Sequence, residues 1–302
     1  MAPIVSVIIP HRNDSNRLVQ CIKALTKQTY PRNLYEIIVI DNCSDNIHKQ
    51  RLIEINNDYN ITLFNEPKLS SYAARNLGLK NAKGSFIAFT DSDCIPEPNW
   101  IEYGLNAFSN CFNCGFISGK VDLFFKEENN PNAIELFEYI FALNQENYIK
   151  DNFAATANIF TSKQVIENVG TFNEDFFSSG DREWCLRVKD KHYNISFCNK
   201  VIVHHPARHS FEAIIKRHLR LCGGKFKHQK AQGISSIKLF FINIFHILPP
   251  VVSIYRVYKN KDFKKIKNNK TKIELIMLMI FLRYLKVLET FKLLIGNDPK
   301  NY

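Results

Sequence analysis

The stretch Phe86-Ile-Ala-Phe-Thr-Asp91-Ser-Asp93-Cys94 is the part of the chain from which the rest is best interpreted. It begins as a short apolar run, which is typical of a strand buried on both faces of a sheet. It then ends in two carboxylates that are one residue apart. Because alternate side chains of a strand point the same way, we expect Asp91 and Asp93 to converge just beyond the strand.

This pair of carboxylates has two possible roles. Two acids held close together repel each other unless a cation lies between them, and a few hard oxygen ligands suit Mn²⁺ or Mg²⁺. The alternative is a polar turn closed by Pro96 and Pro98, in which one of the acids caps the next helix. A D-x-D motif is short and common, so the ends of the other strands decide between the two.

Four segments have the pattern of buried strands, and helical patterns lie between them. The expected strands are Val5–Ile9, Tyr35–Ile40, Ile61–Phe64 and the run that starts at Phe86. Alternation of strands and helices predicts an α/β fold with a mostly parallel sheet covered by helices on both faces. Ligands of such sheets bind beyond the carboxyl ends of the strands. Here those ends carry Pro10-His-Arg-Asn13, Asp41-Asn42 and Asp91-Ser-Asp93.

The sequence disfavours some other classes of protein. It has no G-x-G-x-x-G after the first strand and no G-x-x-x-x-G-K-[ST], which argues against dinucleotide oxidoreductases and P-loop proteins. The eight cysteines include one C-x-x-C, Cys111-Phe-Asn-Cys114, without a second pair at zinc-finger spacing. Reduced thiols in a cytoplasmic protein are therefore expected.

Several motifs resemble those of the GT-A glycosyltransferases of family 2. They are, in chain order, Ser6–Pro10, Glu36–Asn42, Ala73–Gly78, Phe89–Asp93, Ala157-Asn158, Phe172–Glu174, Ser179–Trp184 and His205–Arg208. Together they cover about residues 3–225. The resemblance implies a GT-A fold and an inverting, metal-dependent, hexosyltransferase-type enzyme. It also implies a nucleotide-sugar donor, with a UDP-sugar favoured.

The same resemblance implies roles for individual residues. Pro10 and Asn13 would shape the base pocket and Asp41 would bind the base, although a strand-end Asp can also be a turn former. Arg75 would bind the diphosphate at a helix start, or would otherwise be a solvated helix charge. Asp91 would bind the ribose and the metal, and Asn158 would approach the sugar unless it packs in a strand. The implied metal ligands are Asp91, Asp93 and His205, which is expected to follow a strand over Ile195–Val203.

Asp181 and Glu183 are the candidate catalytic residues. A hydroxyl is a poor nucleophile, so a carboxylate must take its proton during sugar transfer. We expect Asp181 to be the base and Glu183 to bind the acceptor. The alternative is that these acids only cap a helix and favour its dipole. The competing function is a non-catalytic nucleotide-sugar-binding or scaffold protein.

The positive charge of the chain is concentrated near its C-terminus. The net charge is +11, and residues 201–302 hold 20 Lys and Arg against five Asp and Glu. We expect residues 1–110 to form a nucleotide-sugar half, 111–230 an acceptor half and 231–302 a basic, apolar helical appendage. Such an appendage predicts peripheral contact with an anionic membrane at its inner, cytoplasmic face, where lipid-linked acceptors or saccharides are met. Nucleic acid is not expected as a partner.

Overall fold

The computed structural model describes residues 3–248 and 250–298, and the chain divides into two compact units. The first, here called the sheet unit, comprises Met1–Asp122, Leu143–Phe176 and Gly180–Pro206. The second, the helical unit, comprises Leu123–Ala142, Phe177–Ser179 and Ala207–Tyr302. These units do not follow the three consecutive segments expected from the sequence. The expected appendage shares a unit with residues from the middle of the chain.

One mixed sheet of eight strands forms the centre of the sheet unit. Its strands are β1 (Val5–His11), β2 (Tyr35–Asp41), β3 (Thr62–Asn65), β4 (Phe86–Thr90), β5 (Ile95–Pro96), β6 (Cys114–Phe124), β7 (Asn158–Ser162) and β8 (Asn194–Pro206). Their order in the sheet is β3-β2-β1-β4-β7-β6-β8-β5. Strands β1 to β4 pair in parallel, as expected, but β7 pairs antiparallel with both β4 and β6. The expectation of a mostly parallel sheet is therefore correct only for its first half, where strands and helices alternate.

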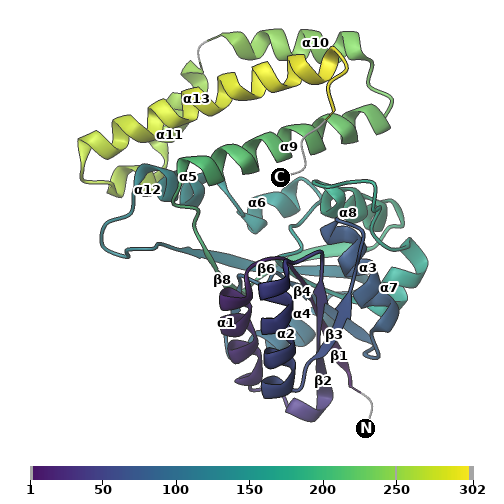
Figure 1. Ribbon diagram of the computed structural model, residues 1–302. Helices are drawn as coiled ribbons and strands as arrows, with labels where there is room; N and C mark the ends of the chain where they lie inside the picture. The colour runs from purple at the N-terminus through teal and green to yellow at the C-terminus, as the bar shows by residue number, and fades with distance from the viewer. Residues whose placement is uncertain (1–2, 249, 299–302) are drawn as a thin grey trace. The chain divides into compact units, whose positions relative to one another are not determined.

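Helices cover both faces of this sheet (Figure 1). They are α1 (Ser15–Thr26), α2 (Asn46–Tyr59), α3 (Ser71–Asn81), α4 (Trp100–Ser109), α6 (Gln145–Lys150), α7 (Lys163–Val169) and α8 (Gly180–Asp190), with a 3₁₀ turn η1 (Arg32–Leu34). One buried cluster joins α1, α2 and α4 to the sheet, and a second joins α3, α7 and α8 to it. Burial of apolar side chains on both faces is what holds the strand ends in place.

Helix α3 begins and packs in a way that fixes its first turns. The Ser70 side chain accepts hydrogen bonds from the backbone N–H groups of Tyr72 and Ala73, so it is the N-cap. Farther along, Gly78 faces β1 so closely that an added Cβ would lie 2.5 Å from Cγ2 of Ile8. Only glycine allows this approach. The start of α3, with Arg75, is thereby fixed against the sheet.

The helical unit consists of packed helices. They are α5 (Ala133–Phe141), α9 (Phe211–Ala231), α10 (Ser236–Ile244), the 3₁₀ turn η2 (Phe245–Ile247), α11 (Val251–Lys259), α12 (Lys261–Lys265) and α13 (Asn269–Leu294). Two small apolar clusters join α5 to α13, one through Ile214 of α9 and the other through α11 and α12. Helices α5 and α6 are separate, because Leu143 between them adopts a left-handed conformation (φ 51°).

Candidate functional site

The loops that follow β1 and β2 are tied together by Asn13. This residue has a left-handed backbone (φ 53°), and its side chain accepts a bond from the Asp45 N–H (2.8 Å) and donates one to Asp45 Oδ2 (3.1 Å). Its own N–H donates to Ser44 Oγ at 3.0 Å. Pro10 lies just before, paired with Ile40 in the sheet. Pro10 and Asn13 therefore help form one rim at the carboxyl ends of β1 and β2.

Asp41 lies on the same rim, largely buried. It is 4% exposed, and its Oδ1 accepts a hydrogen bond from the Ser44 N–H at 3.2 Å. In the sheet, Asp41 of β2 is paired with His11 of β1. His11 is 1% exposed, and neither of its ring nitrogens has a hydrogen-bond partner among the described residues. Burial lowers the pKa of His11 from 6.5 to about 4, against the raising effect of Asp41. No role was predicted for His11, although it directly follows Pro10.

Arg75 and Asp91 form a partly buried ion pair. Nη2 of Arg75 lies 2.5 Å from Oδ1 of Asp91, and its Nη1 donates to the Ser71 carbonyl oxygen at 3.2 Å. The Arg75 side chain is 5% exposed, and its Nε has no partner in the described part of the chain. Asp91 follows β4 directly, and about a third of its side chain is accessible. A guanidinium with an unused N–H suits an anionic group of a ligand.

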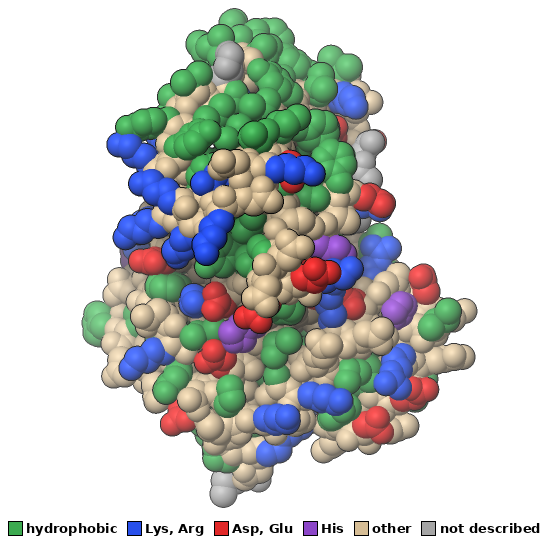
Figure 2. Space-filling model, turned by 90° about the vertical axis from the view of Figure 1, so that its left-hand side faces the viewer, with side chains coloured by type: hydrophobic (Ala, Val, Ile, Leu, Met, Phe, Trp, Pro, Cys, Tyr) green, Lys and Arg blue, Asp and Glu red, His purple; other side chains and the backbone are tan. Residues whose placement is uncertain are grey.

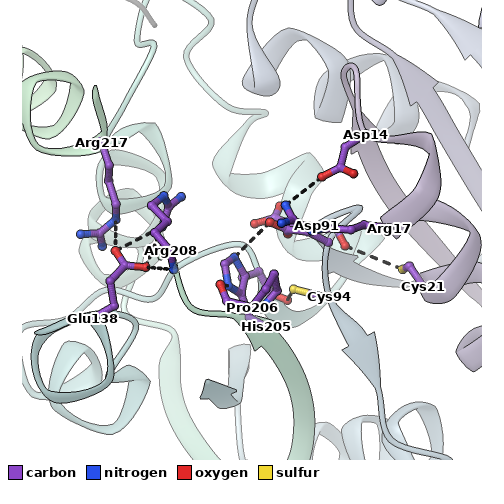
Figure 3. Close-up of polar contacts among 12 residues, drawn as sticks. Asp14, Arg17, Cys21, Asp91, Cys94, Glu138, His205, Pro206, Arg208 and Arg217 are labelled. Atoms are coloured by element: carbon purple, nitrogen blue, oxygen red, sulfur yellow. Dashed lines mark hydrogen bonds and ion pairs between the residues drawn. The ribbon is translucent and has the colours of Figure 1, made fainter. Parts of the chain in front are cut away.

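Asp93, in the turn after β4, faces His205, which Figure 3 labels beside Pro206. Nε2 of His205 lies 3.4 Å from Oδ2 of Asp93, and Nδ1 lies 2.8 Å from the carbonyl oxygen of Pro206. A carbonyl oxygen only accepts hydrogen bonds, so Nδ1 carries a proton. In the neutral ring Nε2 then presents a lone pair to a carboxylate. This orientation is the one that metal-binding histidines adopt when a backbone carbonyl holds the other nitrogen.

The two adjacent histidines belong to the strand itself. β8 extends to Pro206, so the expectation that His205 follows the strand was wrong by a few residues. Adjacent residues of a strand point to opposite faces of the sheet, and the two histidines do so. His204 pairs with Glu97 (3.1 Å), whereas His205 faces Asp93.

Asp181 lies in the first turn of α8, partly accessible to solvent. Its Oδ1 accepts hydrogen bonds from the Arg182 N–H (2.9 Å) and from the Tyr72 hydroxyl (3.4 Å). The Tyr72 hydroxyl in turn accepts a bond from the Gly180 N–H at 2.8 Å. Burial raises the pKa of the Asp181 carboxyl above its ordinary value, the positive charge of Arg75 opposes this, and the negative charge of Asp91 adds to it. Asp181 therefore belongs to the same electrostatic group as Arg75 and Asp91.

The family model for glycosyl transferase family 2 matches residues 6–170, which include all but the first residue of β1, the strands β2 to β4, α3 and the turn with Asp91 and Asp93. This is more than half of the chain. The protein belongs to glycosyl transferase family 2.

Two relatives are similar over most of their length. Glycosyltransferase AglE of Haloferax volcanii is 31% identical over 281 residues, which are 92% of this chain and 91% of the relative. The dolichyl N-acetyl-alpha-D-glucosaminyl phosphate 3-beta-D-2,3-diacetamido-2,3-dideoxy-beta-D-glucuronosyltransferase of Methanococcus voltae is 23% identical and covers 81% of this chain and 77% of its own length.

A solved structure confirms the GT-A type of fold. The mannosyltransferase PcManGT of Pyrobaculum calidifontis, in complex with GDP-Man and Mn²⁺, matches with a TM-score of 0.58 and 14% identity. The match covers 99% of this chain and 77% of the other. The fold expected from the sequence, a GT-A domain followed by C-terminal helices, is thus confirmed for this family 2 glycosyltransferase.

The residues of this family 2 enzyme fit a divalent cation, although they do not form a complete protein cage. The described residues contain no group of three or more His, Cys, Asp and Glu side chains arranged around one point. Mn²⁺ and Mg²⁺ are often bound by one or two carboxylates, with waters and substrate phosphates as the other ligands. Asp93 and His205 supply an oxygen and a nitrogen that face each other, and Asp91 lies in the same turn. That donor set is sufficient for such a cation.

Two expected site residues are used elsewhere. The carboxylate of Glu183 is bound by Arg187 at 2.7 and 3.1 Å, and Arg187 also donates to the carbonyl oxygens of Val169 and Thr171. These bonds hold Glu183 toward α7 and the loop after it, and no bond in the described residues joins it to Asp181.

Asn158 is also committed to the fold. It is 0% exposed, and its amide donates to the carbonyl oxygens of Lys120 and Val201 at 2.8 and 3.0 Å. Its Oδ1 accepts a bond from Trp100 Nε1 at 2.9 Å. Both of its N–H groups are used and the side chain has no accessible surface, so the predicted direct contact with a sugar is not available to it.

Tyr72 is a second site residue for which the sequence predicted no role. It lies three residues before Arg75 on α3, and residues so spaced share a helix face. The Arg75 guanidinium lies over its ring, 5.9 Å from the centroid. Its hydroxyl joins Gly180 to Asp181. The spacing of Tyr72 and Arg75 could have indicated a shared face, but nothing in the sequence connects Tyr72 with residue 181.

Proposed function

We propose that the protein transfers a sugar from a nucleotide-sugar to a hydroxyl group, with inversion at the anomeric carbon. The observation that carries the proposal is the group formed by Asp181, Arg75 and Asp91. It combines a carboxyl of raised pKa with a buried cation at the edge where the parallel strands end. A base is most effective when its pKa approaches the working pH, and an incoming diphosphate needs a cation.

The donor is held by residues on the β1, β2 and β4 ends. In this proposal Asp41, Pro10 and Asn13 border the base, with uridine favoured, and Arg75 binds the diphosphate. Asp91 binds the ribose, and Asp91, Asp93 and His205 would hold Mn²⁺ or Mg²⁺. A bound divalent cation would stabilise the negative charge of the departing nucleoside diphosphate.

The acceptor hydroxyl loses its proton to the Asp181 carboxylate as its oxygen bonds to C1 of the donor sugar. The bond from C1 to the diphosphate oxygen breaks on the opposite face, and the electron pair leaves with the nucleoside diphosphate. One displacement of this kind inverts the configuration at C1. Tyr72 donates a hydrogen bond to the ionised form of Asp181 and keeps its carboxylate oriented.

The acceptor that we propose is a saccharide or a lipid-linked saccharide. The relative from Methanococcus voltae is named for a dolichyl phosphate-linked acceptor, and it resembles this chain over 81% of its length. Synthesis of a cell-surface polysaccharide or a glycolipid is the setting that fits such a substrate.

Two matched variants test the assignment of the base. We expect Asp181→Asn to leave donor binding nearly normal and to lower kcat by about 10²–10⁴-fold, as for loss of a general base. Glu183→Gln should lower it by much less, because Glu183 is paired with Arg187. The turnover of both variants is measured by the release of nucleoside diphosphate in the presence of donor, acceptor and Mn²⁺. A greater loss in Glu183→Gln would reverse the roles, and normal turnover in both variants would remove Asp181 as the base.

The cation site is tested without measuring turnover. Ligands that bind the folded state raise its melting temperature. Mn²⁺ together with a nucleoside diphosphate should raise the Tm of the wild-type protein and should have little effect on Asp93→Asn. Glu97→Gln is the control, since Glu97 pairs with His204 on the other face of β8. An unchanged Mn²⁺ response in Asp93→Asn would contradict the site.

A further inference from the structure

The helical unit has a broad apolar surface that is exposed to solvent. It is formed by α10, η2, α11 and one side of α13, and Figure 2 shows hydrophobic side chains gathered over this unit. More than half of each of the following residues is exposed: Ile237, Phe241, Phe245, Val251, Tyr255 and Met277. Monomeric soluble proteins rarely expose contiguous apolar patches of this kind unless the patch binds something. We call it the apolar surface.

A strongly basic segment joins two of the helices that form this surface. Residues 259–272 connect α11 to α13 and contain seven Lys and one Asp. Lys261, Lys264 and Lys267 are exposed, and Lys259 lies over the ring of Tyr255, 4.8 Å from its centroid. Exposed apolar side chains with lysines beside them are complementary to a layer that has an apolar interior and negatively charged groups at its surface.

We infer that the apolar surface lies on an anionic lipid bilayer, with residues 259–272 at the level of the headgroups. Transfer of exposed apolar side chains from water to the boundary between headgroups and acyl chains lowers the free energy. The negative surface potential of the membrane attracts the lysines beside them, which strengthens binding. A second copy of the chain would satisfy the apolar side chains, but it would carry the same excess of lysines and no matching acidic segment.

The packing of α10 and α11 favours a position in the membrane plane. No single helix in the described ranges is long and apolar enough to span a bilayer, and the pair Ser236–Ile247 and Val251–Lys259 passes that test only together, with a bend of 63°. One side of this pair packs on protein: the Asn243 amide donates to the Val287 carbonyl oxygen at 3.0 Å, and Val257 is buried with Leu275. Only the other side is left for lipid, as in an interfacial helix.

The inference does not depend on the transfer reaction, because a bilayer can be bound without donor or acceptor. If the proposed function also holds, the same surface brings the enzyme to lipid-linked acceptors. Vesicle binding and turnover are measured separately, so failure of one leaves the other standing.

A new tryptophan tests which part of the protein meets lipid. The chain has two tryptophans, Trp100 and Trp184, and both are 0% exposed. In Phe241→Trp, on α10, we expect a blue shift of the emission when vesicles of anionic and zwitterionic lipid are added. Phe112→Trp is the matched control, because Phe112 is 89% exposed in the sheet unit. It should show no shift.

The contribution of charge is tested by a triple variant. Lys261, Lys264 and Lys267 changed together to Gln should lower the partition of the full chain onto anionic vesicles by about 100-fold. The same change at Lys23, Lys27 and Lys49, which are exposed in the sheet unit, is the control with equal loss of charge and should have a small effect.

Four results would overturn the inference. They are no binding to anionic vesicles, equal binding to neutral ones, an equal shift in Phe112→Trp, or an equal loss of binding in the control triple variant. A blue shift of Phe241→Trp that needs no vesicles and follows protein concentration would assign the surface to a second copy instead.

Discussion

His11 combines deep burial with an ionisable ring that has no hydrogen-bond partner among the described residues. Burial lowers its pKa from 6.5 to about 4 in the folded protein, with Asp41, Asp14 and His48 as the ionisable groups around it. Between these two values the unfolded chain binds more protons than the folded one. The contribution of His11 to the free energy of folding is therefore complete above pH 6.5 and is lost as the pH falls toward 4.

We expect the change His11→Phe to reduce the loss of folding stability at acid pH. The difference of about 2.5 pKa units corresponds to roughly 3 kcal/mol of folding free energy. Unfolding curves at a series of pH values should show wild type losing more stability than His11→Phe between pH 6.5 and 4. His209→Phe, at an exposed position, is the control. Parallel pH profiles for wild type and His11→Phe would contradict this account.

The two acids at the start of α8 show the limit of sequence reasoning at this scale. Asp181 and Glu183 are two residues apart, and residues so spaced in a helix do not face each other. From the sequence we expected Asp181 to be the base and Glu183 to bind the acceptor. The pairing of Glu183 with Arg187 and the bond to Asp181 from Tyr72 of α3 were not predicted.

At the scale of elements, Asn158 connects three strands and a helix. From β7 its side chain bonds to the backbone of Lys120 in β6 and Val201 in β8, and it accepts from Trp100 of α4. The motif Ala157-Asn158 was noticed in the sequence, but the distant carbonyl groups that it satisfies were not visible there. Its role in the structure is to hold the antiparallel half of the sheet together.

The change Asn158→Leu should consequently destabilise the protein severely. It leaves one N–H and two carbonyl groups buried without their partner, each at about 1–3 kcal/mol. Thr161→Val in the same strand is the matched control, since the Thr161 hydroxyl donates one hydrogen bond, of 2.7 Å, to the Gly115 carbonyl oxygen. Denaturant unfolding should show a loss at least twice as large for Asn158→Leu. Equal losses would argue that the three bonds matter little.

The alternation of strands and helices predicted the parallel half of the sheet, because a helical segment lies between each pair of consecutive strands from β1 to β4. The antiparallel half was not predicted. β6 and β8 are long, and their pairing depends on partners that are far apart in the chain. The break at Leu143 was missed as well, although Asn144 directly after it caps α6 by accepting from the Asn147 N–H.

At the scale of the whole molecule, the positive charge lies in the helical unit, whose bounds differ from those of the expected appendage. Residues 201–302 carry the positive excess, and the helical unit contains nearly all of them. However, that unit also includes Leu123–Ala142. Glu138 of this segment is fully buried and is bound by Arg208 (3.1 Å) and Arg217 (3.5 Å), as Figure 3 shows. Such an ion pair across the sequence gives no periodic signal from which to predict it.

The packing of α5 against α13 has a consequence for how the protein is made. A ribosome releases the chain from its N-terminus, and segments fold as soon as their partners have emerged. The strands of the sheet unit are all synthesised by Pro206, but α5 emerges long before α13, the last helix in the described part of the chain. Until then the apolar side of α5 lacks its partner in the nascent polypeptide, so it is a natural binding site for a chaperone.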